Sequence, residues 1–383
     1  MKILQVIDSF SPSAGGTASV ACRLSQALSQ RDHEITLYTS DFHLEPGYIT
    51  SLSDIKTYAA HNYLSLGGRP LLMPGMLFRS RRELRDFDII HLHNYPTLPN
   101  VMVHRYARQY NIPYVLQAHG SLATYFQKGV QKMVYDTLWG KTILKGAAKV
   151  IAVASIEAEI YRSMGVDENK IEYVPNGIDA AEFDNLPPRG EFRNRYDLED
   201  RKIVLYLGRI HATKGLNLLV EAFTGLLREH GDALLVITGP DDGCLPALKN
   251  LIKRLHIEEK TIFTGPLYGM EKLQVIIDSD VFAMPSSYEI FGIAALEACL
   301  CGIPVVVTDC CGIAPEITAD MGQVIRYDED ELRDALLKVF TAPEPDEESK
   351  EKRKMALLAR FSWQKLAIEV ECIYRGIVEN HEG

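Results

Sequence analysis

Residues 281–301, VFAMPSSYEIFGIAALEACLC, contain the pattern that decides the fold. Four apolar residues, Val281–Met284, are typical of a strand that is buried on both faces of a parallel sheet. A polar loop that carries Glu289 follows, and a helix is predicted over Phe291–Cys301. A buried strand followed by a loop and a helix is the repeating part of a βαβ unit.

The same pattern recurs through most of the chain. Strands are predicted over Ile3–Ile7, Glu34–Tyr38, Asp88–Leu92, Tyr114–Gln117 and Val150–Val153, and again over Ile203–Leu207, Ala233–Ile237, Thr261–Phe263, Val281–Met284 and Val305–Val307. Helix-length amphipathic stretches lie between them, including Ala18–Ser29, Leu216–Glu229 and Cys244–Leu255. Two such series predict two doubly wound α/β domains with a cleft between them, where ligands bind beyond the carboxyl ends of the strands.

The break between the two series is rich in proline, Asn-Gly and polar residues. It covers Val174–Asp179 and Pro187–Gly190, which is typical of a linker. We therefore predict domains over 1–175 and 176–363, with a helix over Trp363–Val378. The charged segment 342–354 is predicted to be a solvated connector.

Composition excludes several classes of protein. The 383 residues are 46% hydrophobic and 24% charged, which excludes disorder over most of the chain. The net charge of −10 argues against a nucleic-acid binder. No apolar run is long enough for a membrane span, and the N-terminus becomes polar too early for a signal peptide. The seven cysteines form no Cys-x-x-Cys pair, which favours free thiols in a reducing cytoplasm.

Charge is unevenly distributed along the chain. Residues 1–175 hold 18 basic and 15 acidic residues, whereas residues 176–383 hold 23 basic and 36 acidic ones. Within 56–149 there are 13 basic residues against 4 acidic ones. The first domain is therefore expected to present a positive face.

Candidate site residues of the first half follow predicted strands. Gly15 and Gly16 come after the first strand and before a helix, although the Gly-x-Gly-x-x-Gly fingerprint is absent. His119 comes at the carboxyl end of the fourth strand, and His93 and Asn94 follow the third. An ordinary glycine turn and structural histidines remain the alternatives.

Candidate site residues of the second half include two cations and two carboxylates. Arg209 and Lys214 share one glycine-flanked loop and suit a diphosphate, although no Walker motif is present and a solvated charge pair is the alternative. Glu289 lies beside the N-terminal end of a helix, whose first N–H groups lack partners. Glu297 lies in an otherwise apolar helix, where a carboxylate is costly without partners.

Two pairs of aspartates resemble metal-binding motifs. Asp278 and Asp280 imitate an Asp-x-Asp metal motif but precede a core strand, at the wrong end for the cleft. Asp241 and Asp242 are interpreted as part of a loop beside the ligand. No metal site is predicted.

Together these residues resemble the GT-B-fold retaining glycosyltransferases of family 4, also called glycosyl transferase group 1. The resemblance covers nearly the whole chain and is most specific at Glu289 and Glu297, with Phe291-Gly292 between them. It also includes Gly15-Gly16, His119-Gly120, residues 174–179 and the segment from Gly208-Arg209 to Lys214-Gly215. It implies two Rossmann-like domains that face a cleft and a C-terminal helix, about 364–383, that crosses back to the first domain.

The resemblance implies roles for particular residues. The donor would be a UDP- or GDP-sugar, with no metal or other cofactor, and Arg209 and Lys214 would bind its diphosphate with the Gly16 backbone. Glu289 would hold sugar hydroxyls, Glu297 the ribose hydroxyls, and His119 would lie near the reacting sugar. Further donor contacts would come from Gly239, Pro240, Gly265, Pro266, Leu267, Ile290, Phe291 and Gly292. His93 and Asn94 are candidates on the acceptor side.

Two other functions fit parts of the sequence. A nucleotide-sugar 2-epimerase would need no acceptor, and a hinged sugar-binding protein would share two α/β lobes. Incubation with donor alone distinguishes them from a transferase.

The acceptor is expected to be a glycan or a lipid-linked molecule. In the first domain, apolar and basic side chains alternate irregularly within residues 71–82 and 128–149. This combination favours binding to an anionic membrane surface. An amphipathic helix packed on its own sheet is the alternative. The hypothesis is a cytoplasmic enzyme that attaches peripherally to the inner face of the membrane.

Overall fold

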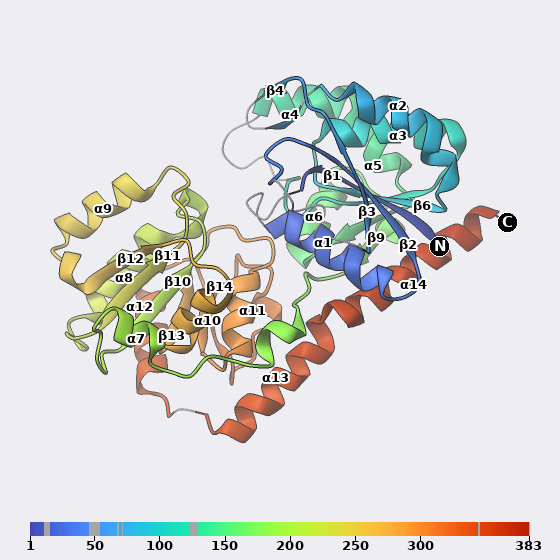
Figure 1. Cartoon of the computed structure of the whole chain (residues 1–383). Coiled ribbons are helices and arrows are strands. Elements are labelled where there is room, and N and C mark those ends of the chain that lie inside the picture. Colours follow the sequence, from blue (N-terminus) through green and yellow to red (C-terminus); the bar gives the residue numbers. More distant parts are fainter. Residues whose placement is uncertain are drawn as a thin grey trace. The chain divides into compact units, whose positions relative to one another are not determined.

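The computed structural model describes residues 1–10, 16–45, 54–66, 69–70, 72–122, 129–343 and 345–382. The chain divides into two compact units (Figure 1). The first comprises Met1–Gly177 and Trp363–Gly383, and the second comprises Ile178–Ser362.

The first unit is built on a seven-stranded parallel sheet with the order β3-β2-β1-β6-β7-β8-β9. The strands that follow β1 in the chain first extend the sheet on one side, through β2, and later on the other side, through β6. The strand order therefore reverses between β1 and β6, which is the switch point of the sheet. The strands are β1 (Lys2–Ser9), β2 (Glu34–Ser40), β3 (Lys56–Ala60), β6 (Ile89–His93), β7 (Tyr114–Gln117), β8 (Lys149–Ala152) and β9 (Ile171–Tyr173). A separate short ladder joins β4 (Ser65–Leu66) to β5 (Arg69–Pro70).

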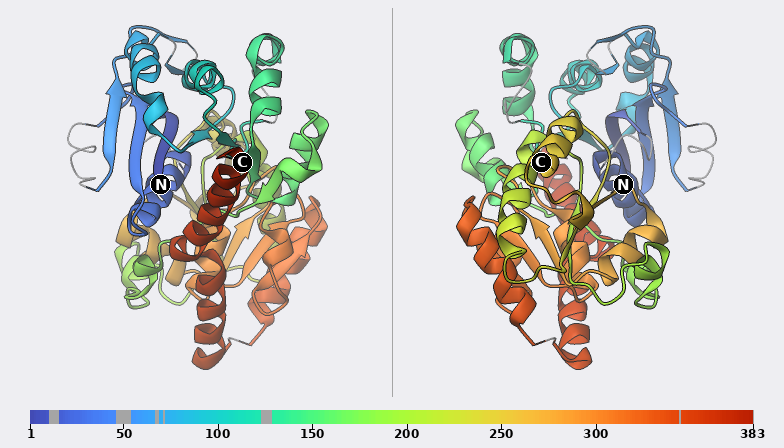
Figure 2. Two further views of the ribbon diagram at one scale, coloured as in Figure 1. Left: turned by 90° about the vertical axis from the view of Figure 1, so that its right-hand side faces the viewer. Right: turned by 90° about the vertical axis from the view of Figure 1, so that its left-hand side faces the viewer.

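Alternate residues of β1 face two different apolar layers. Leu4 and Val6 belong to one buried cluster, whereas Ile3 and Ile7 belong to another that includes residues of α1 and α14. In Figures 1 and 2 the C-terminal helix runs beside α1, and the two helices are in contact. The helices are α1 (Gly16–Ser29), α2 (Pro74–Glu83), α3 (Leu98–Tyr110), α4 (Gly129–Tyr135), α5 (Lys141–Gly146), α6 (Ser155–Ser163) and α14 (Trp363–Glu382).

The second unit has a six-stranded parallel sheet with the order β12-β11-β10-β13-β14-β15. Its switch point lies between β10 and β13. The strands are β10 (Ile203–Leu207), β11 (Leu234–Thr238), β12 (Thr261–Gly265), β13 (Val281–Met284), β14 (Val305–Thr308) and β15 (Gly322–Ile325). The helices are α7 (Glu191–Arg195), α8 (Leu216–Leu226), α9 (Leu245–Arg254), α10 (Gly269–Ile277), α11 (Ile293–Leu300), α12 (Glu329–Thr341) and α13 (Glu347–Phe361).

This architecture confirms the predicted fold class: two parallel sheets covered by helices. In the two large sheets, the strands absent from the prediction are β3, β9 and β15, which lie at sheet edges and are half exposed, so they lack a continuous apolar run.

The prediction of a solvated connector over 342–354 is wrong. Helix α13 begins within it at Glu347, where the Asp346 carboxylate accepts a hydrogen bond from the Ser349 amide at 2.8 Å. Arg353, Leu357 and Phe361 are buried at spacings of four residues. Only Arg353 of this stripe falls inside the segment, so its apolar periodicity was hidden by the surrounding charges.

Candidate active site

The loop after β6 is held at the switch point of the first sheet. Asn94 adopts a left-handed backbone with φ of 64°, and its side-chain amide donates to Asp8 Oδ1 at 2.7 Å. The Asn100 side-chain amide donates to the backbone oxygen of Asn94 at 2.8 Å. These bonds join the carboxyl ends of β1 and β6, where ligands bind in such sheets.

Three imidazole rings form a row behind this edge. The rings of His91 and His93 stack with centroids 4.1 Å apart, and those of His93 and His119 with centroids 5.2 Å apart. His93 and His91 point to the same side of β6 because they are two residues apart. His91 Nδ1 also lies 2.6 Å from the hydroxyl of Tyr374 on α14.

The orientation of the Gln5 side-chain amide sets the direction of the hydrogen bonds along this row. In the orientation that the structure has, Gln5 Oε1 lies 2.6 Å from His93 Nε2 and accepts, so Nε2 carries the proton. His93 Nδ1 must then accept from His119 Nε2, at 2.9 Å. The remaining nitrogen of neutral His119, Nδ1, therefore carries a lone pair, and within the described part of the chain it is buried without a hydrogen-bond partner.

Burial keeps all three rings neutral. It lowers the pKa of His91 and of His119 to about 3, and it lowers the pKa of His93 well below its usual value. The row therefore presents a neutral imidazole rather than a cation.

A buried carboxyl group supports the backbone next to His119. His119 and Gly120 both have left-handed backbones, with φ of 53° and 80°. Glu157 accepts from the Gly120 amide at 2.6 Å and from the Val153 amide at 2.9 Å. Burial raises the pKa of Glu157 to about 7, against the opposing effect of these amides. The sequence reasoning missed Glu157, although its place in the first turn of α6 was a usable signal.

Of the predicted glycine pair, Gly15 lies outside the described residues. Gly16 is the first residue of α1, and no described atom lies within 4 Å of where its Cβ would stand. Packing in the described part of the chain therefore does not explain a glycine there.

In the second unit, Lys214 and Glu289 form an ion pair. The loop after β10 reaches the loop after β13 because Gly215 has φ of 65° and a Cβ there would lie 1.8 Å from the oxygen of Pro285. The Ser287 amide donates to the Thr213 oxygen at 2.9 Å. Thus two residues that are 75 positions apart meet at the switch point of the second sheet.

Arg209 is less enclosed than Lys214. Its Nη1 lies 2.6 Å from Asp242 Oδ2, and the two side chains are 61% and 44% exposed. This exposure leaves the guanidinium free to exchange its partner for a ligand.

The loop from Glu289 to Gly292 is fixed by its backbone. The Glu289 amide donates to the Cys310 oxygen at 3.1 Å, and the Phe291 oxygen accepts from the Ile313 amide at 2.6 Å. Helix α11 begins at Ile293, slightly later than predicted, and no side chain caps it. Within the described chain, no hydrogen bond uses the amides of residues 290–292. These donors and Lys214 suit anionic or hydroxyl oxygens.

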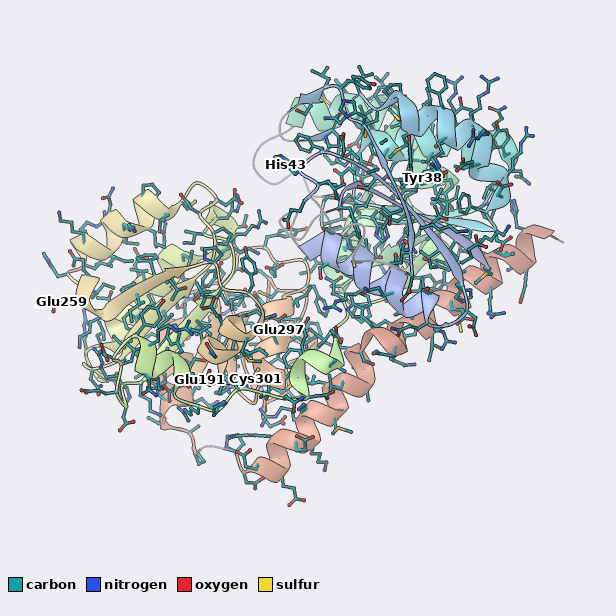
Figure 3. All side chains as sticks on the ribbon, in the orientation of Figure 1. Tyr38, His43, Glu191, Glu259, Glu297 and Cys301 are labelled. Atoms are coloured by element: carbon teal, nitrogen blue, oxygen red, sulfur yellow. The ribbon has the colours of Figure 1, made fainter. Side chains whose placement is uncertain are left out.

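Glu297, labelled in Figure 3, lies on α11. Its Oε1 is 2.9 Å from Nζ of Lys272 on α10, which also lies 3.7 Å from Glu182 Oε2. Burial raises the pKa of the Glu297 carboxyl group, and the Lys272 charge opposes this effect. Lys272 is the partner that the buried carboxylate requires. Sequence reasoning missed it because no spacing links residues on separate helices.

The remaining predicted donor residues lie in neighbouring loops. A Cβ on Gly239 would lie 1.9 Å from the Gly208 oxygen, and the Gly239 amide donates to the Gly265 oxygen at 3.0 Å. The loops after β10, β11 and β12 are thereby joined, and Pro240, Pro266 and Leu267 follow directly.

The acidic pairs considered as metal sites have structural partners. Asp278 accepts from the amides of Phe192 and Arg193 at 2.7 and 2.9 Å, and Asp280 pairs with Arg193 at 2.9 Å. Asp241 accepts from three amides at the start of α9. Among the described residues, no group of three or more His, Cys, Asp or Glu side chains is arranged to hold a metal ion.

Two family models match the chain. Residues 14–182 match Glycosyltransferase Family 4, and residues 188–355 match Glycosyl transferases group 1. The chain belongs to glycosyltransferase family 4. It is therefore an enzyme of the glycosyltransferase class.

Named relatives and solved structures agree with this assignment. This glycosyltransferase is 26% identical to an uncharacterized glycosyltransferase of Methanocaldococcus jannaschii, over 99% of each chain. It is 24% identical to the GDP-mannose-dependent alpha-(1-6)-phosphatidylinositol dimannoside mannosyltransferase of Mycobacterium tuberculosis, over 96% of this chain and 94% of that one. The structure of Anabaena HepE in complex with UDP and glucose has a TM-score of 0.78 at 19% identity, covering 98% of this chain and 100% of that one. That likeness identifies the fold as GT-B.

Proposed function

We propose that this glycosyltransferase moves a sugar from a UDP- or GDP-sugar to an acceptor hydroxyl, with retention of configuration and without a divalent metal. The observation that carries the proposal is the pairing of Lys214 with Glu289 beside the open amides of residues 290–292, at the switch point of the second sheet. A cation, a carboxylate and free N–H groups are what a diphosphate and adjacent sugar hydroxyls require.

Donor binding exchanges the partners of these groups. Lys214 and Arg209 turn from Glu289 and Asp242 to the diphosphate, and Glu289 then accepts hydrogen bonds from sugar hydroxyls. Glu297, whose charge Lys272 neutralises in part, takes the ribose hydroxyls. The names of two similar proteins support both nucleotide types, since one is described as GDP-mannose-dependent and the other was solved with UDP.

The chemistry needs stabilisation of a departing diphosphate. Fixed cations and amide dipoles stabilise the charge that develops on this leaving group, which makes a metal dispensable. Attack from the same face, with the leaving phosphate taking the acceptor proton, gives retention without a carboxylate nucleophile. His119 contributes a neutral imidazole, whose Nδ1 lone pair can accept a hydrogen bond from a sugar hydroxyl.

A thermal-shift panel of UDP-, GDP- and ADP-sugars tests donor binding. A ligand at 100 times its dissociation constant adds about 2.7 kcal/mol to the free energy of unfolding. We expect a UDP- or GDP-sugar to raise the Tm of the wild type and of Lys253→Ala, an exposed lysine on α9, but far less that of Lys214→Ala. Equal shifts in all three proteins would contradict the proposed site.

Product analysis tests the reaction. Incubation with the shifting donor alone should leave it unchanged, and addition of an acceptor should yield a glycoside with the donor's anomeric configuration by NMR. A new nucleotide sugar formed without acceptor would instead identify an epimerase.

We further propose a lipid-linked or membrane-embedded acceptor, because the segment from α4 to α5 exposes apolar and basic residues together. Val134 and Leu138 are 48% and 56% exposed, and Lys141 and Lys145 of α5 are also exposed. Met133 and Trp139 are exposed in the same segment. Each basic residue near an anionic membrane surface can add about 1 kcal/mol of binding.

The structure narrows the predicted surface. Lys132 is buried and pairs with Asp136 at 2.6 Å, and Ile143 and Leu144 lie in the core, so these three do not belong to it. Leu71 and Lys128 lie outside the described residues. Among the described helices, none combines the length and the apolar character that crossing a membrane requires. The relative from Mycobacterium tuberculosis is named for a phosphatidylinositol acceptor, which supports a lipid-linked substrate.

Co-sedimentation with vesicles tests this surface. We expect binding to vesicles that contain anionic lipid, weaker binding at high salt, and a loss of binding in Leu138→Ser. Met355→Ser, which changes a similarly exposed residue on α13, serves as the matched control. Equal binding to neutral vesicles, or none at low salt, would favour a soluble acceptor.

A further inference from the structure

The second unit has a pocket of about 510 Å³ at the amino ends of its strands. Lys202, Asp280 and Pro304 line it and directly precede β10, β13 and β14. The loops that carry Lys214 and Glu289 follow the carboxyl ends of β10 and β13, so the pocket lies at the opposite edge of the same sheet. Its volume is within the range of small-molecule sites.

Arg353 on α13 lines this pocket with an incompletely paired guanidinium. The residue is 5% exposed, and its Nε and Nη1 have no hydrogen-bond partner among the residues that the structure describes. The nearest carboxylate oxygen, Asp320 Oδ2, lies 3.5 Å from Nε on a side chain that is 68% exposed. This long ion pair leaves both nitrogens without a hydrogen bond, which is costly for a buried cation, so two strong donors are available to an anion.

The other charges of the pocket leave a positive excess. Besides Arg353, its lining includes the cations Arg189, Lys202, Lys338 and Lys350, against the carboxylates Asp280 and Asp320. This excess stands out because residues 176–383 as a whole hold 36 acidic against 23 basic residues. A surplus of cations favours a doubly charged anion over a single carboxylate.

Asp280 does not compete for Arg353. Its carboxylate already accepts from the Ile203 amide at 2.8 Å, from Arg193 at 2.9 Å and from Lys202 at 3.1 Å. Its hydrogen-bonding capacity is therefore committed to the start of β10 and to α7.

The pocket also has an apolar wall. Ile303, Pro304, Val339 and Phe340 line it together with Gly302, which follows Cys301 at the end of α11 (Figure 3). The Lys350 chain lies beside Gly302, where a Cβ would stand 3.1 Å from Lys350 Cδ. An organic group can therefore pack beside the bound anion.

We propose that this pocket binds a small organic phosphate, with the phosphate on the Arg353 guanidinium and the organic group against Ile303 and Phe340. The site is distinct from the donor site, because its residues precede the strands whose opposite ends carry the donor loops. Arginine suits this role because its planar donors match phosphate oxygens in pairs.

Isothermal titration with phenyl phosphate tests the proposal, because this probe combines a phosphate with an apolar ring. Phenol and inorganic phosphate each supply one half of the probe, and each should bind more weakly. Arg353→Gln should weaken phenyl phosphate binding about tenfold to a hundredfold, which is the range for hydrogen bonds to charged groups. Lys214→Ala, which disables the donor site, should retain the binding.

The outcomes separate this site from the donor site. Unchanged affinity in folded Arg353→Gln, or loss in Lys214→Ala alone, would overturn the proposal, and the latter result would place the probe in the donor site. If Arg353→Gln does not fold, the double variant Lys338→Ala/Lys350→Ala decides. Each lost charge near a phosphate costs about fivefold in affinity, so unchanged affinity in that variant would also overturn the proposal.

Discussion

Replacing Lys214 by alanine should reduce kcat/KM for the donor by about tenfold to 150-fold. The Lys214 side chain is only 13% exposed and its ammonium group pairs with the Glu289 side chain, which is 18% exposed, so it acts in a partly dehydrated site. A hydrogen bond to a charged group contributes about 1.5 to 3 kcal/mol, and each 1.4 kcal/mol is a factor of ten. If Lys214 contacts the diphosphate as proposed, the contact is present before and during bond breaking, so KM should rise and kcat should fall.

A double-mutant cycle with Glu289→Gln separates two roles for this lysine. If Lys214 acted only by positioning Glu289, adding Lys214→Ala to Glu289→Gln would cost nothing further. Contact with the diphosphate predicts a further loss of at least tenfold. The assay measures initial rates against donor concentration for both single variants and the double variant.

Lys253→Ala provides the matched control, because it removes an exposed lysine of the same unit at α9. The Tm of every variant is measured to exclude unfolding. Activity of Lys214→Ala within twofold of wild type at saturating and at limiting donor would refute the assigned role.

Three other perturbations test the remaining features. Glu297→Gln should raise the donor KM more than it lowers kcat, since ribose binding is remote from the reacting bond; an equal loss in both would place Glu297 in the chemistry. Treatment with EDTA should leave the transfer rate largely intact, whereas a complete loss that added metal reverses would refute metal-free transfer. Burial lowers the pKa of His91 to about 3, so the folded form stays neutral while the unfolded chain takes up a proton below about pH 6.5. The free energy of unfolding should therefore fall by about 1.6 kcal/mol from this group between pH 6.5 and 5. Urea unfolding of His91→Gln should show a correspondingly shallower pH dependence, and an unchanged slope would contradict a neutral buried ring.

Core strands could be predicted because their whole surface is buried. Val281–Met284 and Ile203–Leu207 were predicted with the observed bounds, since both are continuous apolar runs in the middle of a sheet. The edge strand β15 was missed because it is partly exposed and reads like a loop. Helix α13 was missed for a related reason, since its few buried positions are spaced among charged residues.

Candidate residues could be predicted where a polar or charged side chain follows the carboxyl end of a predicted strand. Glu289, Arg209 and His119 were singled out because each follows a buried strand, where parallel sheets bind ligands. Sequence reasoning did not find Glu157, which accepts from the Gly120 amide, Lys272, which pairs with Glu297, or Gln5, which lies against His93. Each lies on a separate element, and the hydrogen bonds that join them depend on how those elements pack.

The sequence alone determined the two parallel sheets and the strand ends that carry candidate residues, because these depend on local composition and on periods of two to four residues. The protonation of His119, the neutralisation of Glu297 by Lys272 and the open donors of Arg353 follow from the tertiary structure instead. These properties depend on burial and on distances between residues far apart in the chain. A charged or polar group takes its state from the atoms packed around it, and no local pattern in the sequence specifies those atoms.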